Sequence, residues 1–264
     1  MRVKIKKPKA VLLDIEGTIT AIDFVRITLF SFVRENLEEY LQNYWLNDEM
    51  KADIRLLRDE AIAMKKNNVD IPLIVDELAN DDEIKASIVK NVLWQMDRNL
   101  KSTSLKQLQG HIWRVGFENG LLKGHFFDDV LTMLPQWKHS LGITFYIYSS
   151  GSVESQKLLM AHTVSGELQS VSAVSVRLEY RGKSYFDTKV GAKIDSQSYA
   201  NILNEIQLNG DDVLFMTDIP TEADAASKCG INCILVVREG NAPLDEETLT
   251  RFKTLRSFEE LDFV

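Results

Sequence analysis

Residues 10–18 of the 264-residue chain have the sequence Ala-Val-Leu-Leu-Asp-Ile-Glu-Gly-Thr. A short apolar run is followed by two acidic side chains, Asp14 and Glu16, and then by Gly17. Such runs are typical of strands that are buried on both faces of a parallel sheet. Because ligands of open α/β sheets bind beyond the carboxyl ends of the strands, this stretch predicts both a central strand and a functional site.

Further apolar runs occur at 143–149, 212–217 and 233–237. Helical patterns lie between them, at 153–162, 196–206 and 222–229, and Gly230 is placed to end the last of these helices. Alternating strands and helices form βαβ units. We therefore predict an α/β fold with a doubly wound, mainly parallel sheet.

The segment from about residue 22 to residue 119 has a different pattern, with apolar residues at helical spacing and no convincing strand. Ser104 and Gln107 have the spacing of a capping box that opens a helix. Because a connection of this length is too long for a loop, we predict an inserted all-helical cap domain. The expected domains are 1–20 with 126–264 for the α/β core, and 21–125 for the cap. Residues 173–185 alternate in a way that suggests a β-hairpin.

The composition limits the classes of partner. The chain has 31 Lys and Arg against 39 Asp and Glu, a formal net charge of −8, which disfavours nucleic acid as a partner. No apolar run is long enough to cross a membrane, and two cysteines are too few for a disulfide framework. We therefore expect no membrane partner, a monomer and a cytoplasmic location; the basic residues at the N-terminus leave a nuclear location open.

Asp14 and Glu16 suit phosphoryl transfer. One carboxylate can attack phosphorus as a nucleophile, and the other can protonate the leaving oxygen and then accept a proton from water. Gly17 allows a tight turn and a close approach of the backbone to a ligand. Acidic residues at a strand end are also common in ordinary solvated turns, so this motif by itself does not identify a catalytic site.

Other strand ends add to the pattern. Ser149 and Ser150 follow the second apolar run and could bind an anion with hydroxyl and N–H groups. Lys193 precedes a helix and could neutralise a phosphate, while Asp218 follows the third run, with Glu222 four residues later. Asp14, Glu16 and Asp218 would supply the hard oxygen ligands that Mg²⁺ prefers.

The order of these motifs resembles that of the haloacid dehalogenase (HAD) superfamily of aspartate-nucleophile phosphotransferases. The chain is also similar to the enolase-phosphatase family of the methionine salvage pathway. The similarity extends over the segments D-I-E-G-T (14–18) followed by Phe24-Val25, L-Q-G-H-I-W (108–113), G-L-L-K-G-H (120–125), Y-I-Y-S-S-G-S-V-x-x-Q-K-L-L (146–159), Y-F-D-T-K-V-G-A-K (185–193) and F-M-T-D-I-P-T-E-A (215–223).

The resemblance implies a HAD-like, Rossmannoid core with a helical cap, and it implies roles for the motif residues. Asp14 would be the nucleophile, Glu16 the acid/base, and Lys193 the third catalytic group. Ser149, Ser150 and Lys193 would bind the substrate. Asp14, Glu16 through its backbone carbonyl, and Asp218 would bind one Mg²⁺ per subunit, supported by Gly17 and Glu222.

The implied reaction has two halves and passes through an aspartyl-phosphate. A 2,3-diketo-5-methylthiopentyl 1-phosphate is enolised and then loses phosphate, giving 1,2-dihydroxy-3-keto-5-methylthiopentene. A HAD-type sugar-phosphate phosphatase or phosphomutase shares the same motifs and is the alternative. A dehalogenase has no need of Glu16 and Asp218. A receiver-like signalling domain is much shorter and has no place for the insert.

Overall fold

The computed structural model describes residues 2–162 and 184–264. The chain divides into two compact units, one formed by Met1–Ile27 with Lys123–Val264, and the other by Thr28–Leu122. The second unit falls inside the insert expected over 21–125. A π-helical segment, η1 (Phe24–Leu29), covers the point where the chain first passes from one unit to the other.

The first unit is built on a six-stranded sheet in which every neighbouring pair is parallel. The strand order is β4-β3-β2-β5-β6-β7. The bounds are β2 (Ala10–Leu13), β3 (Thr144–Tyr148), β4 (Tyr185–Phe186), β5 (Val213–Thr217), β6 (Asn232–Val236) and β7 (Lys253–Leu255). The predicted α/β class with a parallel sheet is confirmed. β1 (Val3–Ile5) and β8 (Leu261–Phe263) form a separate parallel pair.

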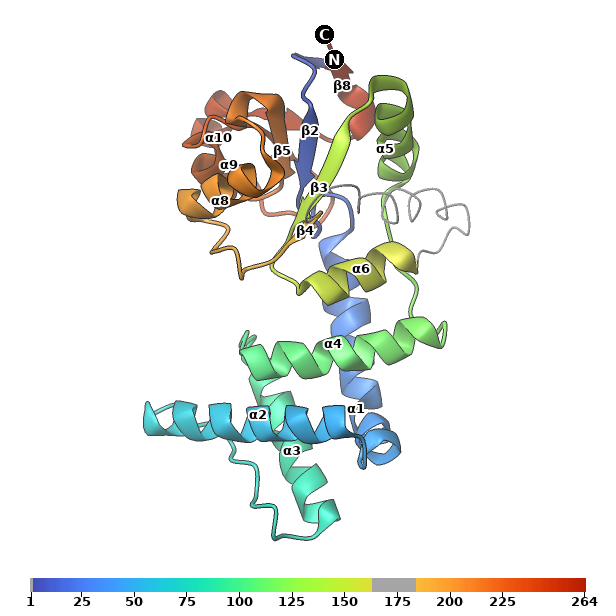
Figure 1. The fold of residues 1–264 in the computed structure, drawn as a ribbon, viewed down its shortest axis with the longest axis vertical. Helices are drawn as coiled ribbons and strands as arrows, with labels where there is room; N and C mark the ends of the chain where they lie inside the picture. The colour runs from blue at the N-terminus through green and yellow to red at the C-terminus, as the bar shows by residue number, and fades with distance from the viewer. Residues whose placement is uncertain (1, 163–183) are drawn as a thin grey trace. The chain divides into compact units, whose positions relative to one another are not determined.

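Helices cover both faces of this sheet (Figure 1). α8 (Ser196–Ile206), α9 (Pro220–Ser227) and α10 (Glu246–Arg251) lie on one side, and α5 (Asp128–Leu141) lies on the other. α6 (Val153–Ala161) follows β3 and contacts β4. All four residues of β2 and all five of β5 are buried, which explains why both strands are apolar throughout.

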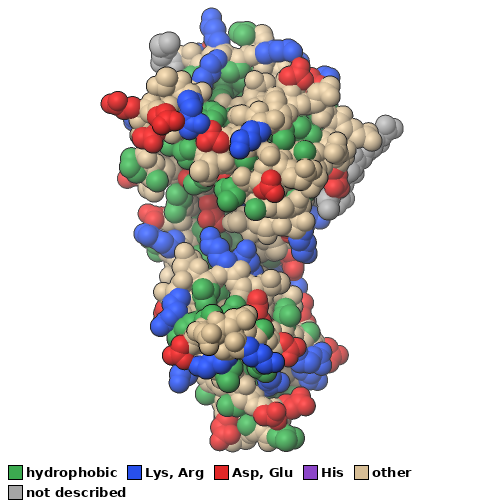
Figure 2. All heavy atoms as spheres, turned by 90° about the vertical axis from the view of Figure 1, so that its left-hand side faces the viewer, with side chains coloured by type: hydrophobic (Ala, Val, Ile, Leu, Met, Phe, Trp, Pro, Cys, Tyr) green, Lys and Arg blue, Asp and Glu red, His purple; other side chains and the backbone are tan. Residues whose placement is uncertain are grey.

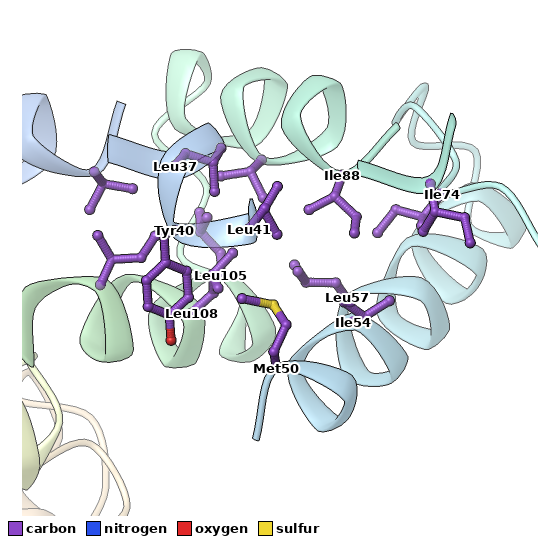
Figure 3. Packing of buried hydrophobic residues seen from close by; sticks show 14 residues of the cluster. Leu37, Tyr40, Leu41, Met50, Ile54, Leu57, Ile74, Ile88, Leu105 and Leu108 are labelled. Carbon is purple, nitrogen blue, oxygen red and sulfur yellow. The ribbon is translucent and has the colours of Figure 1, made fainter. Parts of the chain in front are cut away.

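The second unit holds four α-helices among its described residues: α1 (Phe30–Tyr44), α2 (Asp48–Lys66), α3 (Asp81–Asp97) and α4 (Thr103–Glu118). Their buried faces meet in one apolar core (Figure 3), which includes Leu37, Leu41, Leu57, Ile88, Leu105 and Leu108. The side chains of Asn47, Asn80 and Ser102 cap α2, α3 and α4, because each accepts a hydrogen bond from a backbone N–H in the first turn.

Two local expectations need comment. The capping residue of α4 is Ser102 rather than Ser104, because Ser104 lies inside the first turn and bonds instead to the Glu60 carboxylate from α2. Most of the hairpin expected over 173–185 lies outside the described residues. Its last residue, Tyr185, begins β4, which pairs parallel to β3.

The surface carries charges of both signs. On the face shown in Figure 2, Lys and Arg side chains alternate with Asp and Glu side chains, and neither sign forms a continuous patch over the described residues. Cys229 and Cys233 are both free thiols. In the described ranges, no helix combines the length and the apolar character needed to cross a membrane.

Candidate active site

The candidate site lies where three neighbouring strands of the sheet end. In the register of the sheet, Leu13 of β2 is paired with Ile147 of β3 on one side and with Met216 of β5 on the other. Asp14, Ser149 and Asp218 follow the last residues of β2, β3 and β5. β3 pairs with one edge of β2, and β5, which comes later in the chain, pairs with the other edge. The strand order therefore reverses at this point, and parallel sheets bind ligands at such a topological switch point.

The turn after β2 holds Asp14 firmly. Its backbone N–H donates to the Met216 carbonyl at 3.0 Å, and the Ile15 carbonyl accepts from the N–H groups of Ile19 and Thr20. Gly17 has φ +74°, and a Cβ at this position would lie 2.5 Å from Oδ2 of Asp218. A side chain would therefore be strained by the backbone and would also enter the space of a site carboxylate.

Lys193 is the cation of the site. Its Nζ lies 2.5 Å from Oδ1 of Asp14 and 2.7 Å from Oε2 of Glu222, and all three side chains are buried. Burial alone would lower the pKa of Lys193, but the charges of Asp14 and Glu222 outweigh this effect and raise it. Lys193 is therefore an ammonium ion at neutral pH. Its backbone carbonyl accepts a hydrogen bond from the Tyr199 hydroxyl of α8, with 2.8 Å between the two oxygens. This contact fixes the loop before that helix.

Negative charge exceeds positive charge in this cluster. Burial, with the charges of Asp14 and Glu222, raises the pKa of Asp218 to about 7. Burial and the charge of Asp14 also raise the pKa of Glu222, although Lys193 offsets part of the effect. Glu222 is held further by the Thr217 hydroxyl at 2.8 Å. A divalent cation beside Asp14 and Asp218 would balance this excess of carboxylates.

The donor set fits such a cation. No group of three or more His, Cys, Asp or Glu side chains with metal-site geometry occurs among the described residues. The expected set does not need one, because it uses two carboxylates, Asp14 and Asp218, with the backbone carbonyl of Glu16. Hard cations such as Mg²⁺ take few protein carboxylates and keep several waters.

The hydroxyl-bearing loop follows β3 on the other side of Asp14. Ser149 is buried, its N–H donates to the Phe186 carbonyl at 3.2 Å, and its Oγ accepts from the Gly151 N–H at 3.4 Å. Gln156 of α6 donates to the carbonyls of Gly151 and Phe186, so the loop is fixed to β4. Ser150 lies between these anchored positions.

Comparisons with known proteins show which family the chain belongs to. The chain is 44% identical to the enolase-phosphatase E1 of Acyrthosiphon pisum over 251 residues, which cover 95% of this chain and 96% of that protein. The chain belongs to the enolase-phosphatase E1 family. The chain is accordingly a phosphatase. No protein-family model matches the sequence.

Solved structures show the same fold as this enolase-phosphatase E1 family member. The UTR4 protein of Saccharomyces cerevisiae matches with a TM-score of 0.70 at 29% identity, covering 96% of this chain and 99% of that one. The putative HAD-hydrolase YfnB of Bacillus subtilis, bound to magnesium, matches with a TM-score of 0.51 at 14% identity and 97% coverage of both chains. The resemblance to the enolase-phosphatases is confirmed, and the fold is one that a HAD hydrolase shares.

The structure brings Asp14, Lys193, Asp218 and Glu222 into one cluster, with Gly17 against Asp218. It also adds residues that the sequence analysis did not single out. These are Thr217, Tyr199, Arg238 and Asn241. Thr217 immediately precedes Asp218 and could have been found from that position. Arg238 and Asn241 are more than 200 residues from the loop they bind, and no spacing in the sequence indicates them.

Proposed function

We propose that this protein is a Mg²⁺-dependent enolase-phosphatase of methionine salvage. Its substrate would be 2,3-diketo-5-methylthiopentyl 1-phosphate and its product 1,2-dihydroxy-3-keto-5-methylthiopentene with phosphate. Membership of the enolase-phosphatase E1 family supports the activity. The observation that carries the chemistry is the buried contact of 2.5 Å between Asp14 and Lys193, at the end of the central strand and among further carboxylates.

Asp14 acts as the nucleophile in this proposal. A carboxylate oxygen of Asp14 forms a bond to phosphorus as the bond from phosphorus to the ester oxygen breaks, which leaves an aspartyl-phosphate. Lys193 binds Oδ1 of Asp14, so it orients the carboxylate and offsets the repulsion between two anions. Glu222, which accepts a hydrogen bond from the Thr217 hydroxyl, in turn holds the ammonium group in place.

Glu16 acts as the acid and the base. It protonates the leaving oxygen in the first step and takes a proton from the water that hydrolyses the aspartyl-phosphate in the second. Ser149 and Ser150 hold the phosphate through their hydroxyl groups, together with backbone N–H groups of the loop that follows Ser149. Because the Ser149 loop is tied to β4, these donors are fixed before the substrate arrives.

Asp14, the Glu16 carbonyl and Asp218 would hold one Mg²⁺ per chain, with Gly17 leaving room for the Asp218 carboxylate. When bound, the cation supplies positive charge that neutralises the phosphate and polarises the carbonyl oxygens of the substrate. The helical unit, with its core of α1–α4, is proposed as the cap that excludes water and recognises the methylthio tail. We further propose that the protein is a monomer and that it is located in the cytoplasm, with the nucleus as a second location.

The experiment is phosphate release from small phosphomonoesters with and without metal. Activity is expected to need Mg²⁺ and to disappear with EDTA. Ca²⁺ is expected to inhibit, because its larger and more variable coordination does not keep the required geometry. Full activity in metal-free buffer would contradict the proposed cation.

A further inference from the structure

The loop that follows β6 holds the loop that follows β2. Nε of Arg238 donates to the Thr18 carbonyl at 3.2 Å, and Nδ2 of Asn241 donates to the Gly17 carbonyl at 2.9 Å. Arg238 is itself fixed by an ion pair with Asp129 at 2.8 Å, and both side chains are largely shielded from solvent. The backbone beyond Asp14 and Glu16 is thus anchored from a distant part of the chain.

The orientation of the Asn241 amide follows from its partners. Nδ2 contacts two carbonyl oxygens, that of Gly17 at 2.9 Å and that of Val236 at 3.1 Å. A reversed amide would place its oxygen against both of them. The other amide atom, Oδ1, is therefore assigned as an acceptor.

This acceptor has no hydrogen-bond partner within the described parts of the chain, although it is buried. It lies beside the site, because a Cβ on Gly17 would be 2.9 Å from Oδ1 of Asn241 and 2.5 Å from Oδ2 of Asp218. Both oxygens therefore pack against Gly17 and lie within about 5.4 Å of each other. Since buried acceptors are nearly always satisfied, Oδ1 of Asn241 calls for a donor such as an ordered water.

We propose that Asn241 is a positioning residue that couples the Gly17 backbone to the cation site. Its NH₂ group fixes the Gly17 carbonyl and thereby the peptide chain at Glu16. Its Oδ1 accepts a hydrogen bond from a water that belongs to the hydration shell of the cation beside Asp218. The inference rests on the proposed function, because it takes the site to bind Mg²⁺.

Two variants separate the two roles of the side chain. Asn241→Ala removes both the donor and the acceptor, while Asn241→Asp keeps an oxygen acceptor and loses the donor to the Gly17 and Val236 carbonyls. Residues that hydrogen-bond to the ligands of a metal ion, without binding the ion themselves, typically change its affinity by about 10–100-fold. We expect Asn241→Ala to weaken Mg²⁺ binding about 10–100-fold. We expect Asn241→Asp, which keeps the acceptor, to weaken Mg²⁺ binding less than Asn241→Ala does, and to lower kcat at saturating Mg²⁺ because the Gly17 carbonyl loses its donor.

The measurement is calorimetric titration of the full-length proteins with MgCl₂ alone, together with thermal unfolding to verify folding. Glu239→Gln is the matched control, because it removes a charge from an exposed position of the same loop; its affinity and kcat should equal those of the wild type. If Asn241→Ala does not fold, Asn241→Asp decides: a loss of Mg²⁺ affinity below about 10-fold supports the proposal, and a loss of about 10-fold or more overturns it.

The outcomes separate this inference from the proposed function. Wild-type protein that binds no Mg²⁺ overturns both. Wild-type binding with unchanged affinity in folded Asn241→Ala overturns the role of Asn241 alone. Equal losses of affinity in Asn241→Ala and Asn241→Asp also overturn it, because the acceptor would then contribute nothing.

Discussion

At the scale of single residues, the pairing of Asp14 with Lys193 connects the proposed catalysis to stability. Removal of one partner of a buried ion pair typically costs about 3–5 kcal/mol, because the other charge is left buried and unpaired. Lys193 has a second carboxylate, Glu222, at 2.7 Å. A variant at Asp14 therefore leaves the ammonium group with a partner.

Asp14→Asn should abolish phosphate release while the protein still folds. The amide has nearly the same shape as the carboxylate but cannot attack phosphorus, and Glu222 still pairs with Lys193. The loss of stability should therefore stay below the 3–5 kcal/mol range. Single-turnover phosphate release and thermal unfolding measure the two effects. Substantial turnover by Asp14→Asn would show that Asp14 is not the nucleophile.

Glu16→Gln should slow phosphate release by about 10²–10⁴-fold, the usual contribution of general acid–base catalysis. Mg²⁺ should stay bound, because Glu16 is proposed to contribute its backbone carbonyl, which the substitution keeps. Rapid-quench kinetics with parallel Mg²⁺ titration check both parts. A Glu16→Gln enzyme with wild-type rates would exclude Glu16 as the acid/base.

At the scale of elements, a buried polar contact joins α2 to α4 inside the helical core. Nδ1 of His111 lies 2.6 Å from Oδ2 of Asp53, whose Oδ1 accepts from Gln107 at 2.7 Å. Glu49 lies on the other side of the ring, where it also pairs with Arg114. Burial lowers the pKa of His111, but the hydrogen bond and charge of Asp53, helped by Glu49, outweigh it and raise the pKa above the ordinary value.

The stability of this unit should therefore fall as the pH rises above neutrality. A folded-state pKa above the unfolded value of about 6.5 means that the stabilisation is complete below pH 6.5 and is lost as the pH passes through the folded-state pKa. The neutral ring can still donate from Nδ1 to Asp53, so the stabilisation that is lost is the attraction between the imidazolium charge and the carboxylates of Asp53 and Glu49.

Urea unfolding between pH 6 and pH 9, followed by tryptophan fluorescence, measures the effect. Three of the four tryptophans, Trp45, Trp94 and Trp113, lie in this unit. His111→Gln should remove the pH dependence, whereas His139→Gln, at an exposed position in the other unit, should keep it. An unchanged pH profile in His111→Gln would contradict the role of the pair.

Helices and strands with a clear apolar pattern of their own could be predicted from the sequence. Short strands that exist only because they pair with a longer strand could not. α8 begins and ends where the helical spacing predicts, and the apolar runs fall on β2, β3, β5 and β6 to within two residues. β4 and β7 have two and three residues, so only pairing with a longer strand makes them strands. The cap of α4 is Ser102 rather than Ser104, which lies in the first turn and bonds to Glu60 of another helix.

At the scale of the whole molecule, the order of motifs along the chain carried most of the information about the site. Because parallel strands end at one edge, side chains after β2, β3 and β5 had to converge, and Asp14, Ser149 and Asp218 do so. No such rule predicts that Asn241 anchors Gly17, because this contact depends on the path of the loop after β6.

The central claim concerns the substrate, and an assay on the diketo phosphate itself tests it most directly. Wild-type protein is incubated with 2,3-diketo-5-methylthiopentyl 1-phosphate and Mg²⁺, and enol absorbance and free phosphate are recorded in the same sample. We predict that both products form in equal amounts, and faster than phosphate is released from generic sugar phosphates. Much faster release from sugar phosphates, with no enol formed from the diketo phosphate, would contradict the account.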